Sequence, residues 1–218
     1  MKNGLSTRGF VVLPRSALPS PALARAVLRG IPDDGRPGLK EWRLYARKTG
    51  WAADGEKAPP GYRRIKGFAR ALTAELRRLL PRETFELDVV HLRLTQGRPA
   101  YTNHPHFDSD YLTASCALEG PGTILYWRDR SGVHRKPAPT GTTAVITSQR
   151  RQAATGIPST IHSAPFGKLK RRVVLIIFYT RAGVSAGLSL RGKLKAEQRF
   201  FQRHYGAPDP ELNATVRR

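Results

Sequence analysis

The fold is decided by a stretch that begins at Leu112 and ends at Trp127, with the sequence LTASCALEGPGTILYW. It contains two short runs of the β type, Leu112–Leu118 and Thr123–Trp127. Between them lie Gly120, Pro121 and Gly122, residues that interrupt both helices and strands. Short runs with this composition, bounded by turn residues, are typical of β-strands. The stretch therefore predicts two short strands separated by a turn.

Similar runs continue on both sides of this stretch. They are Phe85–Leu94, Thr142–Thr147, Ser159–His162 and Val173–Thr180. Glycine and proline residues separate most of them, and we expect no helices in between. About six to eight short strands without intervening helices favour an all-β sandwich or barrel core.

The flanks of the chain show a helical pattern instead. Tyr62–Leu80 has apolar residues at three- and four-residue steps, with Arg and Lys on its other faces, which predicts an amphipathic helix. Pro21–Leu28 and Leu190–Tyr205 are further helix candidates, and Gly9–Leu13 is a strand candidate. We expect the stretch Asp33–Pro60 to be rich in loops.

These elements predict one domain over residues 1–218, mainly β with flanking helices (α+β). We expect helical N-terminal support over 1–84, a β core over 85–181 and a C-terminal helical tail over 182–218. The single cysteine, Cys116, excludes an internal disulfide framework and any multi-cysteine zinc or iron–sulfur site. No signal-peptide core is present, and no stretch approaches the about 18 apolar residues of a membrane span. We therefore expect a cytoplasmic protein without a transmembrane segment.

The charge balance is the unusual feature of the composition. Lys and Arg total 38 against 16 Asp and Glu, which gives a net charge of +22. Such an excess indicates a polyanionic partner, either nucleic acid, an acidic protein or an anionic lipid surface. The alternative is a solvated surface in a generally arginine-rich protein, and the sequence leaves both interpretations open.

Four residues are candidates for a metal and anion site. His106 and Asp108 are two residues apart, so on a strand both side chains point to the same face. His162 lies on a later β-type run, and two histidines with one carboxylate are the donors of the facial triad that binds Fe(II). Arg172 follows His162 by ten residues and enters a strongly apolar run, where its guanidinium needs an anionic partner.

In this pattern of H-x-D, a later H and an R ten residues further on, the sequence resembles the Fe(II)/2-oxoglutarate-dependent dioxygenase superfamily. The resemblance covers roughly residues 85–181. It implies a double-stranded β-helix core of the jelly-roll or cupin-like type, with helices at both ends. It also implies that His106, Asp108 and His162 are the catalytic iron ligands and that Arg172 binds the distal carboxylate of 2-oxoglutarate. The opening segment Thr7–Pro14 looks like the N-terminal strand of small-molecule hydroxylases in the superfamily.

The resemblance further implies a reaction. Fe(II), the cosubstrate 2-oxoglutarate and O₂ would together oxidise a substrate, with 2-oxoglutarate decarboxylated to succinate and CO₂. The protein would then be a hydroxylase that positions the substrate and excludes water.

Several assignments have competitors. His104 is two residues before His106, so a His104/His106 pair is the alternative metal set, as in three-histidine cupins. Arg171 competes with Arg172, since neighbouring strand residues face opposite ways. Further cosubstrate contacts are expected from a set of polar side chains near the motif: Tyr101, Thr113, Arg93 and Tyr126. We expect His91 to be a core histidine.

The substrate stays open, with three kinds in competition. A small molecule, including an anionic one, is favoured by the size of the chain and by Thr7–Pro14. Nucleic acid fits the charge of +22. However, the alkylated-DNA repair dioxygenases carry a second arginine six residues after the first, and Phe178 stands there. An acidic protein or peptide is the third kind. A binding or sensory cupin-like barrel without catalysis is the alternative to all three.

We also expect the basic residues in loops near the motif to form a positive rim around the open end of the barrel, where they would steer an anionic substrate. These residues are Arg98, Arg128, Arg130, Arg135, Lys136, Arg150, Arg151, Lys168 and Lys170.

Overall fold

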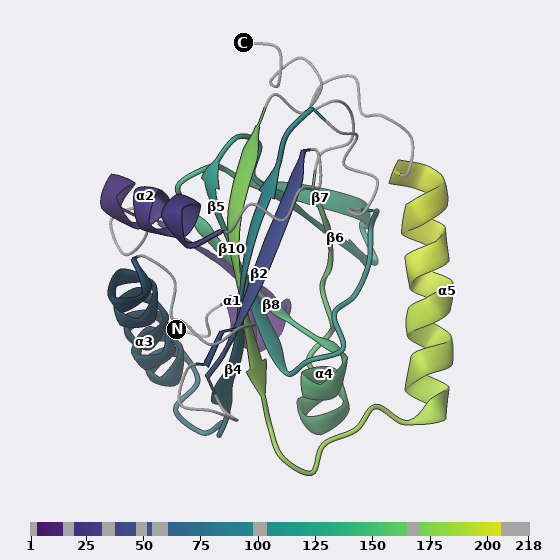
Figure 1. Ribbon diagram of the computed structural model, residues 1–218. Helices are drawn as coiled ribbons and strands as arrows, with labels where there is room; N and C mark the ends of the chain where they lie inside the picture. The colour runs from purple at the N-terminus through teal and green to yellow at the C-terminus, as the bar shows by residue number, and fades with distance from the viewer. Residues whose placement is uncertain are drawn as a thin grey trace.

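Two antiparallel sheets form the centre of the fold (Figure 1). The computed structural model describes residues 4–14, 20–31, 38–46, 52–53, 61–97, 104–164 and 171–205. The larger sheet has the strand order β1-β8-β5-β10-β4-β2-β3, and the smaller has the order β7-β6-β9. The strands are β1 (Phe10–Leu13), β2 (Leu39–Tyr45), β3 (Ala52–Ala53), β4 (Glu86–Thr95), β5 (Leu112–Glu119), β6 (Thr123–Asp129), β7 (Gly132–Ala138), β8 (Thr143–Thr147), β9 (Ile161–Ser163) and β10 (Arg172–Thr180). The helices are α1 (Gly4–Thr7), α2 (Pro21–Gly30), α3 (Tyr62–Leu79), α4 (Gln149–Thr155) and α5 (Leu188–Tyr205).

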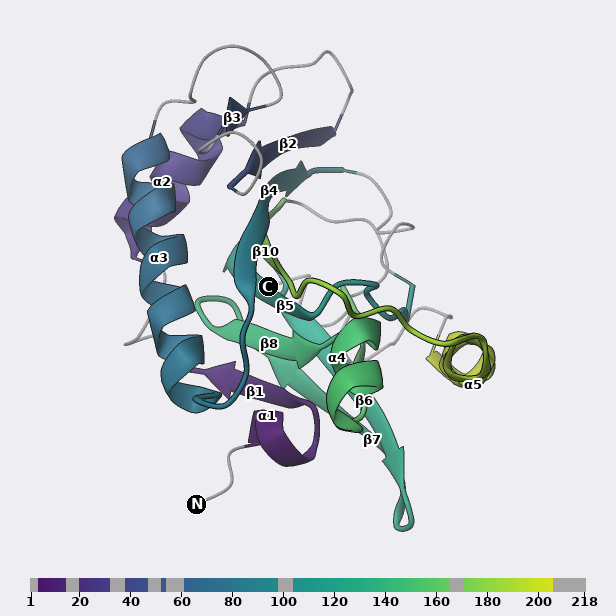
Figure 2. The same cartoon turned by 90° about the horizontal axis from the view of Figure 1, so that it is seen from below.

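The two faces of the large sheet have different roles, which β10 illustrates. Its residues Val173, Leu175 and Ile177 are buried in the main core together with the apolar faces of α2 and α3. The intervening residues Ile176 and Phe178 line a cavity on the opposite face. This alternation follows from the two-residue period of a strand. Figure 2 shows α2 and α3 together on one side of the large sheet, with α5 on the other side of the molecule.

The two sheets are joined where the sequence predicts a turn. Gly120, between β5 and β6, has a φ of +75°, and a Cβ there would lie 2.1 Å from the Arg171 carbonyl oxygen. Only glycine fits this position without strain. Just beyond the turn, the hydroxyls of Ser115 and Thr123 form a hydrogen bond of 2.8 Å from one sheet to the other. Leu125 of β6 packs with Phe10 and Ile146 of the large sheet.

The strands expected from Phe85 onward are all present, as are the three flanking helices, so the predicted fold class is confirmed. The expectation of no helix between these strands is wrong, because the short helix α4 lies between β8 and β9. The first 84 residues differ from the expected helical support, because β1 and β2 extend the large sheet at both of its sides. The segment of β2 was expected to be loop. Its alternate residues Glu41 and Arg43 are charged, so it lacks the apolar alternation by which strands are recognised. β7 was also missed, because it contains Pro137, which an edge strand tolerates.

Arg151 does not belong to the positive rim, and that prediction is wrong for this residue. Its side chain is completely buried and donates two hydrogen bonds of 2.7 Å to the carboxylate of Glu83. It also donates to the Leu5 carbonyl at 2.9 Å and to the Thr147 hydroxyl. The Tyr111 hydroxyl donates to the same carboxylate at 2.8 Å. Burial raises the pKa of Glu83, but the bonds from Arg151 outweigh this and hold the pKa below its ordinary value.

This buried pair generates a stability prediction. Arg151→Ala leaves the Glu83 carboxylate partly buried without its cation, which we expect to lower the free energy of unfolding by about 3–5 kcal/mol. The neighbouring Arg150 is exposed, so Arg150→Ala should change it by no more than about 0.5 kcal/mol. Urea denaturation of the two variants measures the difference. Equal midpoints would show that the Arg151 network contributes nothing to stability.

Candidate active site

A short backbone pairing brings the two predicted histidine ligands together. His106 and His162 form an isolated antiparallel bridge in which each amide donates to the other's carbonyl at 3.0 Å. The imidazole rings lie on the same side, with centroids 4.3 Å apart. Residues that pair directly across two strands project to one face, so this bridge fixes both side chains relative to each other.

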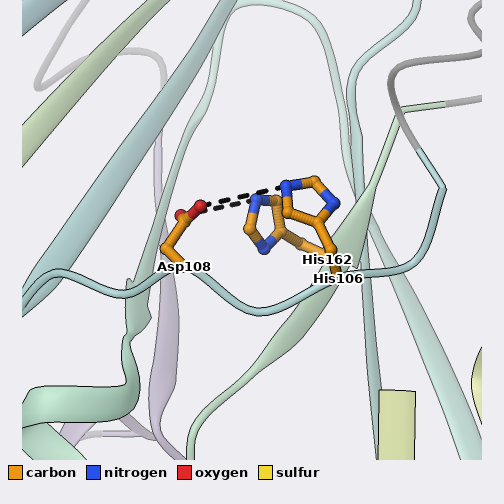
Figure 3. Close-up of side chains that lie close together, drawn as sticks. All are labelled: His106, Asp108 and His162. Carbon is orange, nitrogen blue, oxygen red and sulfur yellow. Dashed lines mark ion pairs between the residues drawn. The ribbon is translucent and has the colours of Figure 1, made fainter. Parts of the chain in front are cut away.

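Asp108 completes the group (Figure 3). Its carboxylate oxygens lie 3.8 Å from Nε2 of His106 and 3.5 Å from Nε2 of His162. One ligand atom from each of the three residues lies within 4.8 Å of the others. Two ligands of one ion, each about 2.1 Å from it and at right angles, are about 3 Å apart, so these atoms would move closer together when they share a metal. Asp108 Oδ2 is buried and has no hydrogen-bond partner among the described residues, as expected of a ligand atom.

The protonation of both histidines suits metal binding. His106 Nδ1 lies 2.6 Å from the His104 carbonyl oxygen, which can only accept, so Nδ1 carries the proton and the Nε2 lone pair faces Asp108. Burial lowers the pKa of His162 to about 4, although Asp108 acts in the opposite direction. His162 is therefore neutral at pH 7, and a neutral imidazole is the form that binds metals.

The three side chains lie in the wall of a cavity of about 480 Å³ between the sheets. The large sheet contributes polar and apolar residues to the lining, and these are Arg43, Tyr45, Val89, His91, Arg93, Ser115, Arg172, Ile176 and Phe178. The small sheet contributes Thr123, His162 and Ser163. The volume lies within the range of about 300–1,000 Å³ common for small-molecule sites.

Arg172 lines this cavity and Arg171 does not, which is the orientation that the ten-residue spacing predicts. Arg172 is 4% exposed, and its Nε donates to the Pro121 carbonyl at 3.0 Å. Burial and the nearby Arg93 lower its pKa to about 10, so it is still cationic at pH 7. No carboxylate of the described residues pairs with it. Arg171 instead forms an ion pair of 3.2 Å with Glu119 near the surface.

Among the other predicted contacts, Arg93 lines the cavity, whereas Thr113 and Tyr126 do not. Tyr101 lies outside the described residues. Thr113 is buried, but its hydroxyl forms a hydrogen bond with Ser148 at 3.2 Å, and it is not among the residues that line the cavity. Ser115, on the same face of β5, does line it. The Tyr126 hydroxyl forms a hydrogen bond with Ser163 at 3.0 Å.

Those basic residues of the expected rim that the structure describes do not line the cavity. Arg128 pairs with Glu197 of α5 at 2.6 Å, and Arg135 is exposed on β7. Arg98, Lys168 and Lys170 lie outside the described residues. Sequence reasoning missed Arg43, which was assigned to a loop and lines the cavity. His91 is buried, as expected of a core histidine, but it also lines the cavity. Arg43 reaches this face because it lies in strand β2, and that strand was not predicted from the sequence.

Comparison with solved structures identifies the fold. A 2OG-Fe(II) oxygenase family oxidoreductase from Burkholderia pseudomallei matches 84% of this chain and 91% of its own, with a TM-score of 0.57 and 15% identity. An oxygenase from Shewanella oneidensis matches 90% and 92%, with a TM-score of 0.58 and 15% identity. The fold is that of the 2-oxoglutarate/Fe(II) oxygenases. The rice dioxygenase for auxin oxidation has this 2-oxoglutarate/Fe(II) oxygenase fold too, matching 99% of this chain and 92% of its own, with a TM-score of 0.56 and 16% identity. No family model and no curated protein matches the sequence.

The geometry generates a prediction on metal binding. Replacing a ligand should cost more than the about 10–100-fold typical of residues behind the ligands, so we expect His162→Ala to weaken Fe(II) binding by about 100-fold or more. His104→Ala keeps the carbonyl that accepts from His106 and should leave the affinity unchanged. Anaerobic calorimetric titration measures both. Loss of binding in His104→Ala would instead favour the alternative in which His104 and His106 both bind the metal.

Proposed function

We propose that this protein is an Fe(II)- and 2-oxoglutarate-dependent oxygenase that hydroxylates a small molecule. The observation that carries the proposal is the meeting, in one cavity, of the His106–Asp108–His162 group and the buried cationic Arg172. Two imidazoles and a carboxylate bind Fe(II) on one face and leave three positions for other ligands. A buried arginine without a carboxylate partner requires an anion, which 2-oxoglutarate supplies.

Each residue then has a defined part. His106, Asp108 and His162 hold the metal, and Arg172 binds the distal carboxylate of 2-oxoglutarate in a two-point contact. The bound metal, with 2-oxoglutarate and O₂, supplies the oxidising chemistry, in which one oxygen atom enters the substrate and one enters succinate while CO₂ leaves. Ile176 and Phe178 form apolar wall beside the site, so they help to exclude water and to position the substrate.

A small molecule is favoured over nucleic acid by the same wall. Phe178, six residues after Arg172, presents an aromatic ring to the cavity, where a phosphate-binding residue would be cationic. Arg181, further along the chain, is directed to the Tyr111 hydroxyl at 3.3 Å.

Among the described residues, none of the helices is long and apolar enough to cross a membrane.

Succinate formation tests the activity. The purified protein is incubated with Fe(II), 2-oxoglutarate and O₂, alone and with a library of small molecules, and succinate is measured by NMR. We expect Fe(II)-dependent succinate that a subset of compounds stimulates, and none from Asp108→Ala. Tight metal and 2-oxoglutarate binding without succinate under any condition would instead identify a binding or sensory barrel.

Arg172 and Arg171 provide a matched pair of variants. Arg172→Gln removes two charge-assisted hydrogen bonds, so we expect the affinity for 2-oxoglutarate to fall by about 100-fold or more, with Fe(II) still bound. Arg171→Gln alters only a surface ion pair and should have little effect. Calorimetric titration of 2-oxoglutarate into each Fe(II)-loaded variant measures this. The reverse result would assign the cosubstrate to Arg171.

A further inference from the structure

Two rows of side chains cross the large sheet on the cavity side. In the first, Glu41 of β2 lies opposite Arg93 of β4. In the second, Arg43 lies opposite His91, and His91 lies opposite Ile176 of β10. Residues directly opposite one another share a face, so the second row presents a cation, an imidazole and an apolar side chain to the same space.

The first row is electrically neutral and the second is not. Arg93 Nε donates to Glu41 Oε1 at 2.5 Å, so the charge of Arg93 is compensated within the wall. Arg43 is exposed to the cavity, and no carboxylate of the described residues forms an ion pair with it. The second row therefore places a cation without an ion-pair partner among the described residues in the same cavity as the proposed metal.

His91 provides an independent observation in the same row. It is 4% exposed, and its Nε2 has no hydrogen-bond partner among the described residues. The nearest carboxylate oxygen, Glu41 Oε1, is 3.5 Å away and already accepts from Arg93. An unpaired buried nitrogen is unfavourable, and a ligand that bonds to it removes that penalty. Burial and the flanking arginines lower the pKa of His91 to about 4, so the ring is neutral and Nε2 can donate or accept.

This row is separate from the place where Arg172 would hold 2-oxoglutarate. Arg172 lies opposite Thr95 on β4, four residues from His91, which is about 13 Å along the strand. Arg43 lies one strand further from β10. One five-carbon dicarboxylate at Arg172 therefore leaves Arg43 and His91 for a different anion. The next row contains Val89 opposite Phe178, so apolar surface adjoins the charge.

We propose that the substrate is a small amphipathic anion whose carboxylate or phosphate binds to Arg43 and His91, with its apolar part on Val89 and Phe178. The inference rests on the proposed function, because it assigns the substrate side of the same cavity. It makes Arg43 a specificity-determining residue that distinguishes charged from neutral substrates of the same shape.

A binding experiment tests this without requiring turnover. Phenylacetate, phenyl phosphate and neutral phenylacetamide are titrated calorimetrically into the anaerobic protein loaded with Fe(II) and 2-oxoglutarate. We expect at least one of the two anions to bind, with phenylacetamide about 10-fold weaker or more. The anion that binds tighter identifies the group as carboxylate or phosphate.

Variants assign the binding to the row. Arg43→Gln should weaken anion binding by about 10- to 100-fold, the loss expected for one charge-assisted hydrogen bond. Arg70→Gln removes the same charge from the exposed face of α3, on the other side of the large sheet, and should bind the anion like the unsubstituted protein. His91→Gln, which keeps a hydrogen-bonding group, should lose less affinity than His91→Leu.

Three results would overturn the inference. They are absence of anion binding, equal binding of phenylacetamide, and an Arg43→Gln variant that loses 2-oxoglutarate affinity instead of probe affinity. The last would mean that Arg43 belongs to the cosubstrate. Failure of the proposed function is recognised separately, because the protein would then bind neither Fe(II) nor 2-oxoglutarate before any probe is added.

Discussion

The proposed chemistry depends on one pair of backbone hydrogen bonds, those exchanged by His106 and His162 at 3.0 Å. These residues are far apart in the chain, and the bridge sets how their imidazoles lie relative to each other. A slip of one residue in this pairing would turn one ring away from the other, because strand side chains alternate between faces. Asp108 can join them only because it follows His106 by two residues. The grouping of the three proposed metal ligands is therefore a consequence of the register in which His106 pairs with His162.

That register is maintained by contacts on both sides of the cavity. β9 pairs with β6, where His162 lies opposite Leu125, and Leu125 is buried against the large sheet. The hydrogen bond between Ser115 and Thr123 ties the sheets together where Gly120 permits the chain to turn. The buried Arg151 network links α1, α4 and the segment before β4, and the amide of Gln149 at the start of α4 donates to the Asp108 carbonyl at 3.0 Å. The site is thus placed by tertiary contacts between segments that are far apart in the chain.

The sequence predicted what local spacing determines and missed what depends on distant partners. The His106/Asp108 pair follows from strand alternation, and Arg172 was chosen by its ten-residue interval after His162. His162 was joined to the pair by the resemblance to the dioxygenase superfamily, and all four residues line one cavity. Arg151 could not be recognised as buried, because its partner Glu83 is 68 residues away. Thr113 and Ser115 share a face of β5, and they differ only in that the cavity extends along the strand to Ser115 and not to Thr113. Arg43 could be assigned to the cavity only if strand β2 was predicted, and the charged alternate residues of this strand are typical of a loop.

The net charge of +22 therefore says less about function than the individual environments of the arginines. Three of them line the cavity, and each is in a different electrostatic state. Arg93 is neutralised by Glu41. Arg172 is desolvated and cationic, a state that is unfavourable until an anion arrives. Arg43 is exposed, and no carboxylate of the described residues forms an ion pair with it. A bound 2-oxoglutarate would neutralise the charge of Arg172 but not that of Arg43. The positive charge of Arg43 is therefore available to select a substrate by its charge.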